Sequence, residues 1–104
     1  NLTPARIQSL PTSLAELDLS GCDVEGFDFS RFINLRKLKL WGAQNLSPAQ
    51  IQSLPTSLIE LDLTFCDVEG FDFSHFINLQ KINLWGAQNF TDEQRTELTA
   101  ILRL

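Results

Sequence analysis

The sequence predicts an α/β solenoid with a parallel concave sheet of four main strands, short convex helices and a C-terminal capping helix. Residues 1–44 align with residues 45–88 without a gap, and 35 of the 44 positions are identical. Within each copy, a pattern of apolar residues recurs at spacings of 21 and 23 residues. Repeats of this size indicate stacked units, because one unit cannot bury its own apolar face. We expect a single domain, 1–104, with strand units starting near residues 14, 35, 58 and 79.

Composition excludes several classes of protein. Hydrophobic residues make up 43% of the chain and charged residues 20%, a balance typical of a folded, soluble domain. A net charge of -5 argues against nucleic acid as a partner, since binding phosphates requires clustered lysine and arginine. The sequence also lacks a long apolar span and a basic, apolar leader, so we expect no membrane partner.

The strand units alternate apolar and polar residues, which places their side chains on opposite faces. Leu17 and Leu19 are expected in the core, with Glu16 and Asp18 facing outward. The first strand has no dedicated cap before it. Its edge therefore predicts self-association, and three apolar residues near it are expected to be partly exposed. These are Leu2, Ile7 and Leu10.

The two cysteines follow the first and third strands. Cys22 and Cys66 are expected to be buried and to donate weakly to a carbonyl of the neighbouring coil. They lie two coils apart, about 10 Å, which is beyond the roughly 7 Å reach of a disulfide. Free thiols favour a reducing compartment, either cytoplasmic or, for a bacterial effector, the host cytosol.

The outer side of the solenoid alternates helical and aromatic segments. In the longer units, Ser47 is expected to cap a short helix, Pro48 to lie in its first turn and Pro55 to end it. The first copy offers Thr3, Pro4 and Pro11. The shorter units carry apolar residues expected to stack from coil to coil and dominate the core. These are Val24, Phe27, Phe29, Phe32, Val68, Phe71, Phe73 and Phe76.

The last segment, residues 90–104, departs from the repeat and predicts a C-terminal cap. Thr91 and Gln94 suit a capping box at the start of a helix over residues 92–103. Arg95 takes the place of the apolar Ile51, as expected where no further coil follows.

The strand motifs read LAELDLSGC, LRKLKLWGA, LIELDLTFC and LQKINLWGA. They resemble the leucine-rich repeat family, whose motif is LxxLxL followed by two variable residues and Asn or Cys. The long units, ending in WGAQNL[ST], look like the cysteine-containing subclass, with Ala43 and Ala87 replacing its Cys. LPTSL at 10–14 and 54–58 is similar to bacterial LPxxL repeats. The resemblance implies a non-enzymatic scaffold that binds a protein on its concave face.

Two alternatives remain open. The near identity of the two copies also fits an engineered or idealised repeat protein with no natural partner. The subclass resemblances fit a fragment of a bacterial effector or of a ubiquitin-ligase substrate receptor.

The outward strand positions predict three columns across the concave face. Two columns alternate in charge, which either orders and neutralises the face or docks a partner. Trp41 and Trp85 share the third column, where they either bind a partner or shield the end of the core. Phe65, next to this column, either extends an aromatic ridge or is buried under the turn. The candidate partner-binding residues are Glu16, Asp18, Lys37, Lys39, Trp41, Glu60, Asp62, Thr64, Phe65, Lys81, Asn83 and Trp85.

No pattern predicts catalysis, a cofactor or a metal. His75 is the only histidine and is expected on the solvated convex face, away from the buried Cys66. Acidic residues along one loop edge could attract a basic partner or Ca²⁺, but they lack the spacing of a Ca²⁺ loop and favour a solvated edge. These are Asp23, Glu25, Asp28, Asp67, Glu69 and Asp72.

Overall fold

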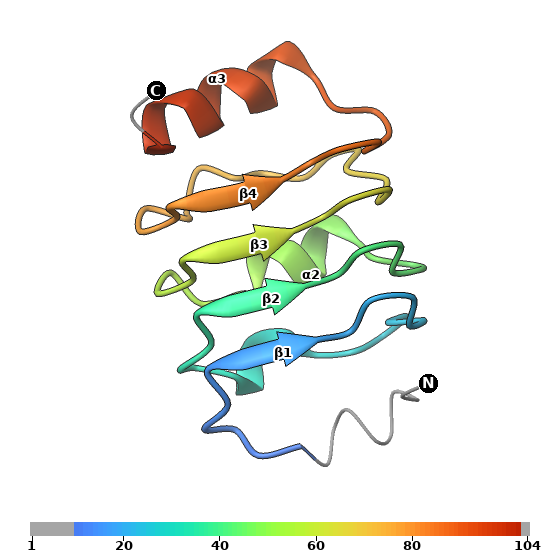
Figure 1. Cartoon of the computed structure of the whole chain (residues 1–104), viewed down its shortest axis with the longest axis vertical. Helices are drawn as coiled ribbons and strands as arrows, with labels where there is room; N and C mark the ends of the chain where they lie inside the picture. The colour runs from blue at the N-terminus through green and yellow to red at the C-terminus, as the bar shows by residue number, and fades with distance from the viewer. Residues whose placement is uncertain (1–9, 103–104) are drawn as a thin grey trace.

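The computed structural model of the chain describes residues 10–102 and shows a solenoid in which each coil contributes one short strand. The strands form one parallel sheet in sequence order, and the last helix lies beyond β4 (Figure 1). The predicted fold class is therefore confirmed. The elements are β1 (Glu16–Asp18), the 3-10 helix η1 (Phe29–Arg31), β2 (Lys37–Lys39), α2 (Pro48–Gln52), β3 (Glu60–Asp62), β4 (Lys81–Asn83) and α3 (Asp92–Leu102).

The register of the sheet follows directly from the repeat. Leu38 of β2 stands between Leu17 of β1 and Leu61 of β3, so the inward side chains stack along the axis. Hydrogen bonds between coils continue past the strands. The Leu19 amide donates to the backbone carbonyl of Lys39 at 2.8 Å, and the Leu40 amide donates to that of Asp62 at 2.8 Å. Each coil is therefore bonded to the next through its strand and the turn after it.

Aromatic side chains fill the space between the sheet and the outer segments. Phe29 and Phe73 have no exposed surface, as expected for core residues. The expected stacking from coil to coil is not observed: among residues 10–102, the phenylalanine rings of this core touch within a single loop. The coil between the two loops contributes the buried aliphatic residues Ile51 and Leu54 instead. The core is thus two aromatic clusters separated by an aliphatic layer.

The helix α2 begins with the predicted cap. The side chain of Ser47 accepts from the Gln50 amide at 3.3 Å, and the Gln50 side chain accepts from the Ser47 amide at 2.9 Å. The helix ends at Gln52, before Pro55. The corresponding Thr3 and Pro4 of the first copy lie outside the described residues.

The helix α3 packs on the last coil, as predicted for a cap. Thr91 and Gln94 form the expected capping box, with distances of 2.9 and 3.1 Å. Leu98 is buried against the core, while Arg95 is exposed and its guanidinium lies 5.5 Å from the centre of the Phe90 ring. Within residues 10–102, no helix has both the length and the apolar character needed to cross a membrane.

The first coil is less completely covered than the central ones. Leu10 is half-buried, as predicted, and Leu17 of β1 is also half-buried, whereas Leu38 of β2 is 1% exposed. Leu2 and Ile7, for which partial exposure was also predicted, lie outside the described residues.

Candidate functional site

The strand register brings the outward polar residues into the predicted columns. Two rows of paired residues cross the sheet, and charge alternates along them except at the last position of the second. Between β2 and β4 the face forms a shallow depression of about 250 Å³, bordered by lysine and carboxylate side chains. The first row is Glu16, Lys37, Glu60 and Lys81, and the second is Asp18, Lys39, Asp62 and Asn83.

The second row also shapes the turns that follow the strands. Asp18 accepts from the Ser20 amide at 3.0 Å, and Asn83 accepts from the Trp85 amide at 3.0 Å. Bonds from the side chain and amide of Ser20, with a smaller contribution from Lys39, hold the pKa of Asp18 below its ordinary value, against a partial desolvation. These side chains therefore anchor the backbone as well as carrying polarity.

The third column does not present all its residues to solvent. Thr64 is only 6% exposed, and its hydroxyl donates to Asp62, whose side chain also accepts from the Thr64 amide. Thr64 thus offers little surface to a partner, in contrast to its predicted outward position. Trp41 and Trp85 of the same column are 50% and 70% exposed.

Phe65 joins the two tryptophans into one surface. Its ring centre lies 6.0 Å from that of Trp41 and 5.0 Å from that of Trp85, and its side chain is 45% exposed. Of the two predicted placements, the structure shows the aromatic ridge. We use this name for Trp41, Phe65 and Trp85. Exposed aromatic residues packed into one patch are typical of interaction surfaces.

The backbone of Phe65 is held in a conformation that glycine normally adopts. Its φ is +63°, while the equivalent positions in the other coils are Gly21, Gly42 and Gly86, with φ between +66° and +75°. A bulky residue in this region carries strain of the order of 1–3 kcal/mol. The glycine at 86 leaves room for the ring, since a Cβ there would lie 2.5 Å from Phe65 Cδ1.

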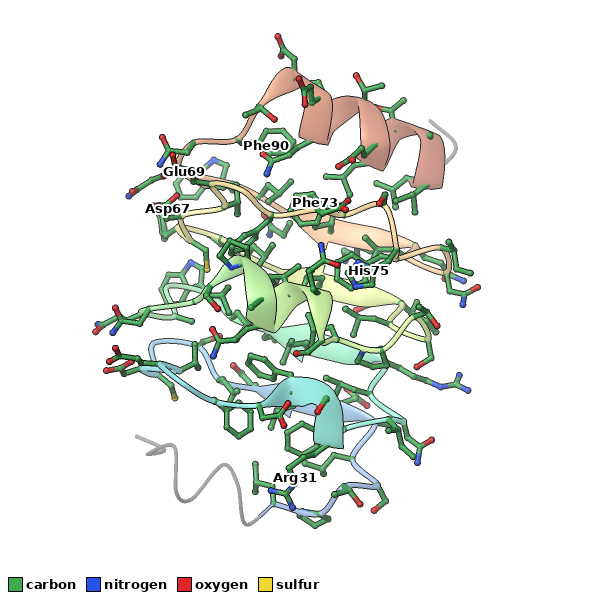
Figure 2. All side chains as sticks on the ribbon, turned by 180° about the vertical axis from the view of Figure 1, so that it is seen from behind. Arg31, Asp67, Glu69, Phe73, His75 and Phe90 are labelled. Carbon is green, nitrogen blue, oxygen red and sulfur yellow. The ribbon has the colours of Figure 1, made fainter. Side chains whose placement is uncertain are left out.

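A row of polar residues borders the ridge at the isolated β-bridges that follow the strands. Asp23 pairs with Gln44, and Asp67 pairs with Gln88. Asp67 accepts from Asn89 Nδ2 at 2.9 Å and from the Glu69 amide at 3.1 Å, and these bonds hold its pKa below the ordinary value. Figure 2 shows Asp67 and Glu69 together at one edge of the molecule. The ridge therefore lies beside ionised carboxylates.

The model of the leucine-rich repeat family matches residues 13–35, which contain β1 and the loop that follows it. The other three strands repeat that motif in register with it. The fold is that of a leucine-rich repeat solenoid. Leucine-rich repeat domains are commonly protein interaction modules and are typically non-enzymatic. No curated protein and no solved structure matches the chain significantly.

The cysteines of this leucine-rich repeat are both buried and free. Cys66 donates to the Leu40 carbonyl of the preceding coil at 2.9 Å, as predicted, and burial raises the pKa of its thiol. The thiol of Cys22 instead lies 3.9 Å from the carbonyl oxygen of Ser20 in its own coil. A buried thiol that stays protonated is a packing residue and a poor nucleophile.

His75 differs from its predicted position on the solvated surface of the leucine-rich repeat. Both of its ring nitrogens are buried without a hydrogen-bond partner, and its ring lies 3.9 Å from that of Phe76, centre to centre. Within the described part of the chain, no three His, Cys, Asp or Glu side chains cluster in a way that could hold a metal ion.

Two further features of this leucine-rich repeat were missed by the sequence reading. Ile33 and Ile77, at equivalent positions before the second and fourth strands, are 70% and 69% exposed. Their place in the repeat was visible, but the alternation of apolar residues does not extend into the turn where they lie. Gln94 was expected only as part of a capping box and no role was expected for Gln50, yet both are buried and bridge neighbouring coils.

Proposed function

We propose that this leucine-rich repeat domain is a non-enzymatic scaffold that binds a protein partner on its concave face. The observation that carries the proposal is the aromatic ridge: three exposed aromatic side chains in contact, next to the open face of the sheet. The proposed contacts are the ridge itself and the charged columns beside it, with Thr64 as a buried support. The columns comprise Glu16, Asp18, Lys37, Lys39, Glu60, Asp62, Lys81 and Asn83.

The ridge and the columns would have different parts in binding. Buried aromatic anchors usually supply most of the affinity of an interface, while charges at its rim steer association and exclude wrong partners. On the strands at the ends of the sheet the charged side chains are exposed, whereas Glu60 and Asp62 of β3 are half-buried. A partner that covers the ridge would therefore also meet alternating charges.

Phe65 argues against the alternative of an idealised repeat without a partner. An idealised sequence would carry glycine at this position, as the other three coils do. A strained backbone that persists against an available glycine is typical of a functional site.

The proposal is tested by quantitative capture from cell lysates, with three versions of the chain. We expect the wild type and an Ile33→Ser/Ile77→Ser control to retain the same saturable partner, and a Trp41→Ala/Trp85→Ala variant to lose it. The control removes apolar surface of similar exposure from outside the ridge. Equal capture by all three folded proteins would place the contact elsewhere and refute the proposal.

We also propose self-association through the edge of β1. Among residues 10–102 this strand pairs only with β2, and Leu10, Leu14 and Leu17 next to it are half-buried. An open strand edge beside apolar residues is a template for pairing between chains. We expect the mass measured by light scattering to rise with concentration; a constant monomer mass would contradict the proposal.

A further inference from the structure

The aromatic ridge offers hydrogen-bond donors as well as apolar faces. The side chains of Trp41 and Trp85 are exposed, and neither indole N–H donates to any of residues 10–102. A partner that fits this surface should present flat apolar groups together with unpaired carbonyl oxygens. In an α-helix most carbonyl oxygens accept hydrogen bonds from the helix itself. A polyproline II segment forms no internal hydrogen bonds, so its carbonyl oxygens remain available to a donor.

The spacing of the ridge also matches that conformation. Trp41 and Trp85 belong to coils two apart, which separates their backbones by roughly 9.6 Å. A polyproline II helix repeats every three residues, or about 9.3 Å. Prolines at positions i and i+3 of such a segment, lying along the solenoid axis, would therefore meet one tryptophan each, with Phe65 between them.

On the side of the ridge away from the alternating charges of the strands, carboxylates select the flanks of the segment. Asp23 and Asp67 lie at the isolated β-bridges, their pKa values are held below the ordinary value by hydrogen bonds from Asn45 and Asn89, and the chain carries a net charge of -5. Indole faces also attract cations. Both effects favour lysine or arginine beside the prolines.

From these observations we propose that the aromatic ridge is a docking site for a basic, proline-rich segment in the polyproline II conformation, with prolines three residues apart. This inference rests on the proposed function and specifies its partner chemistry. Phe65 has a defined part in it: the strained residue closes the gap between the tryptophans, so that the segment meets a continuous aromatic surface.

The test uses the two indole N–H signals of the isotope-labelled chain, which contains only two tryptophans. The probe is a synthetic peptide with two lysines followed by Pro-Pro-Ala repeated three times. We expect both indole signals to shift saturably. A peptide of equal charge and length with serine in place of proline should bind at least about tenfold more weakly. The proline peptide with glutamates in place of its lysines should lose affinity to the same extent.

Variants of the chain connect the binding to the ridge. Phe65→Gly should weaken binding of the proline peptide about tenfold or more, and it should fold because glycine occupies this position in the other coils. Trp85→Ser, at a 70% exposed position, should do the same. The control Ile77→Ser should leave the affinity unchanged.

Three results would overturn the inference. These are the absence of shifts in the indole signals, equal affinity for the serine peptide, and tighter binding of a basic amphipathic helix than of the proline peptide. If any of them occurred while lysate capture still depended on Trp41 and Trp85, the proposed scaffold function would stand and only the partner chemistry would fall. If capture failed as well, both would fall.

Discussion

The contact between Phe65 and Gly86 shows how a single exchange between the two copies creates a surface. Glycine at position 21 becomes phenylalanine at 65, and the ring can lie over the next coil only because position 86 has no side chain. The strained backbone of Phe65 and the free space at Gly86 are thus both needed for this contact, and mutation can test each one separately.

We predict that Gly86→Ala destabilises the domain more than Gly42→Ala does. Both glycines have positive φ, so alanine should cost about 1–2 kcal/mol at either position. At 42 an added Cβ meets nothing within 4 Å, whereas at 86 it meets the Phe65 ring at 2.5 Å. Urea unfolding measures the difference. In a Phe65→Gly background the two substitutions should cost the same; a gap that persists there would show that the Phe65 ring is not its cause.

Phe73 is the residue on which we expect core stability to depend most clearly. It has no exposed surface, and its ring lies 6.3 Å from that of Phe71 and 6.4 Å from that of Phe76. Figure 2 shows it in the interior of the molecule. Replacement by alanine should cost about 3–5 kcal/mol, because the rigid neighbours cannot fill the cavity. A loss below about 1 kcal/mol in equilibrium unfolding would contradict this packing.

At the residue scale, the alternation of side chains along each strand predicted the columns but not which residues of a column are accessible to solvent. Thr64 and Trp85 occupy the same column, yet their exposures are 6% and 70%. The difference arises from tertiary neighbours and from the hydroxyl bond to Asp62, which alternation does not encode. The same holds for His75, whose ring is held against Phe76 and whose nitrogens are buried.

At the level of elements, two buried glutamines tie each helical segment to the coil before it. The side-chain amide of Gln94, in the first turn of α3, donates to the carbonyls of Val68 and Phe71 at 2.8 and 3.0 Å. Gln50 of α2 donates in the same way to Val24 and Phe27. One side chain therefore caps a helix and fixes its position on the preceding loop.

We predict that Gln94→Glu destabilises the domain at neutral pH and that acidification recovers part of the loss. A carboxylate cannot donate to the two carbonyls, which leaves buried groups unpaired at about 1–3 kcal/mol each. Burial beside carbonyls raises the folded-state pKa of the new glutamate, so its penalty decreases as pH falls toward and below that pKa. Unfolding measured from neutral to mildly acidic pH tests this. The exposed Glu93→Gln serves as a control that should change stability little.

The elements could be predicted where a local motif defines them. The caps at Ser47 and Thr91 followed from sequence, because a capping box needs only residues three apart. The 3-10 helix η1 was not predicted: Asp28 caps it, but the equivalent loop of the second copy, which differs only at Arg31/His75, forms a turn. Two segments that differ at one position thus adopt different local conformations, which the repeat pattern alone does not predict.

For the whole molecule, we predict a loss of stability in acid that comes from aspartates in turns. Hydrogen bonds from serine, asparagine or backbone amides lower the pKa of five aspartates from the ordinary value of 3.8. Such groups contribute stability above the ordinary pKa, and the contribution is lost as pH falls through the lower folded pKa. The five are Asp18, Asp23, Asp28, Asp67 and Asp72.

Thermal unfolding from about pH 5 down to about pH 2 measures this loss. An Asp23→Asn/Asp67→Asn variant should depend less steeply on pH, because it has two fewer such groups. An identical pH dependence in the variant would show that these two aspartates do not contribute.

The overall architecture was the most predictable level. An ungapped internal repeat fixes the strand order and register together, because equivalent residues of successive coils must pair. What the repeat could not supply is the composition of the core between coils, where Ile51 and Leu54 separate the two aromatic clusters.

The bonds between coils give the domain a direction of mechanical weakness. In Figure 1 the strands lie across the long axis, so hydrogen bonds such as that from the Val24 amide to Gln44, 3.0 Å, run along it. Tension applied between the two ends of the solenoid loads these bonds one rung at a time. Because each repeat of a solenoid is held mainly by its neighbours, the coils should detach in succession at low force, and the domain should extend gradually under load.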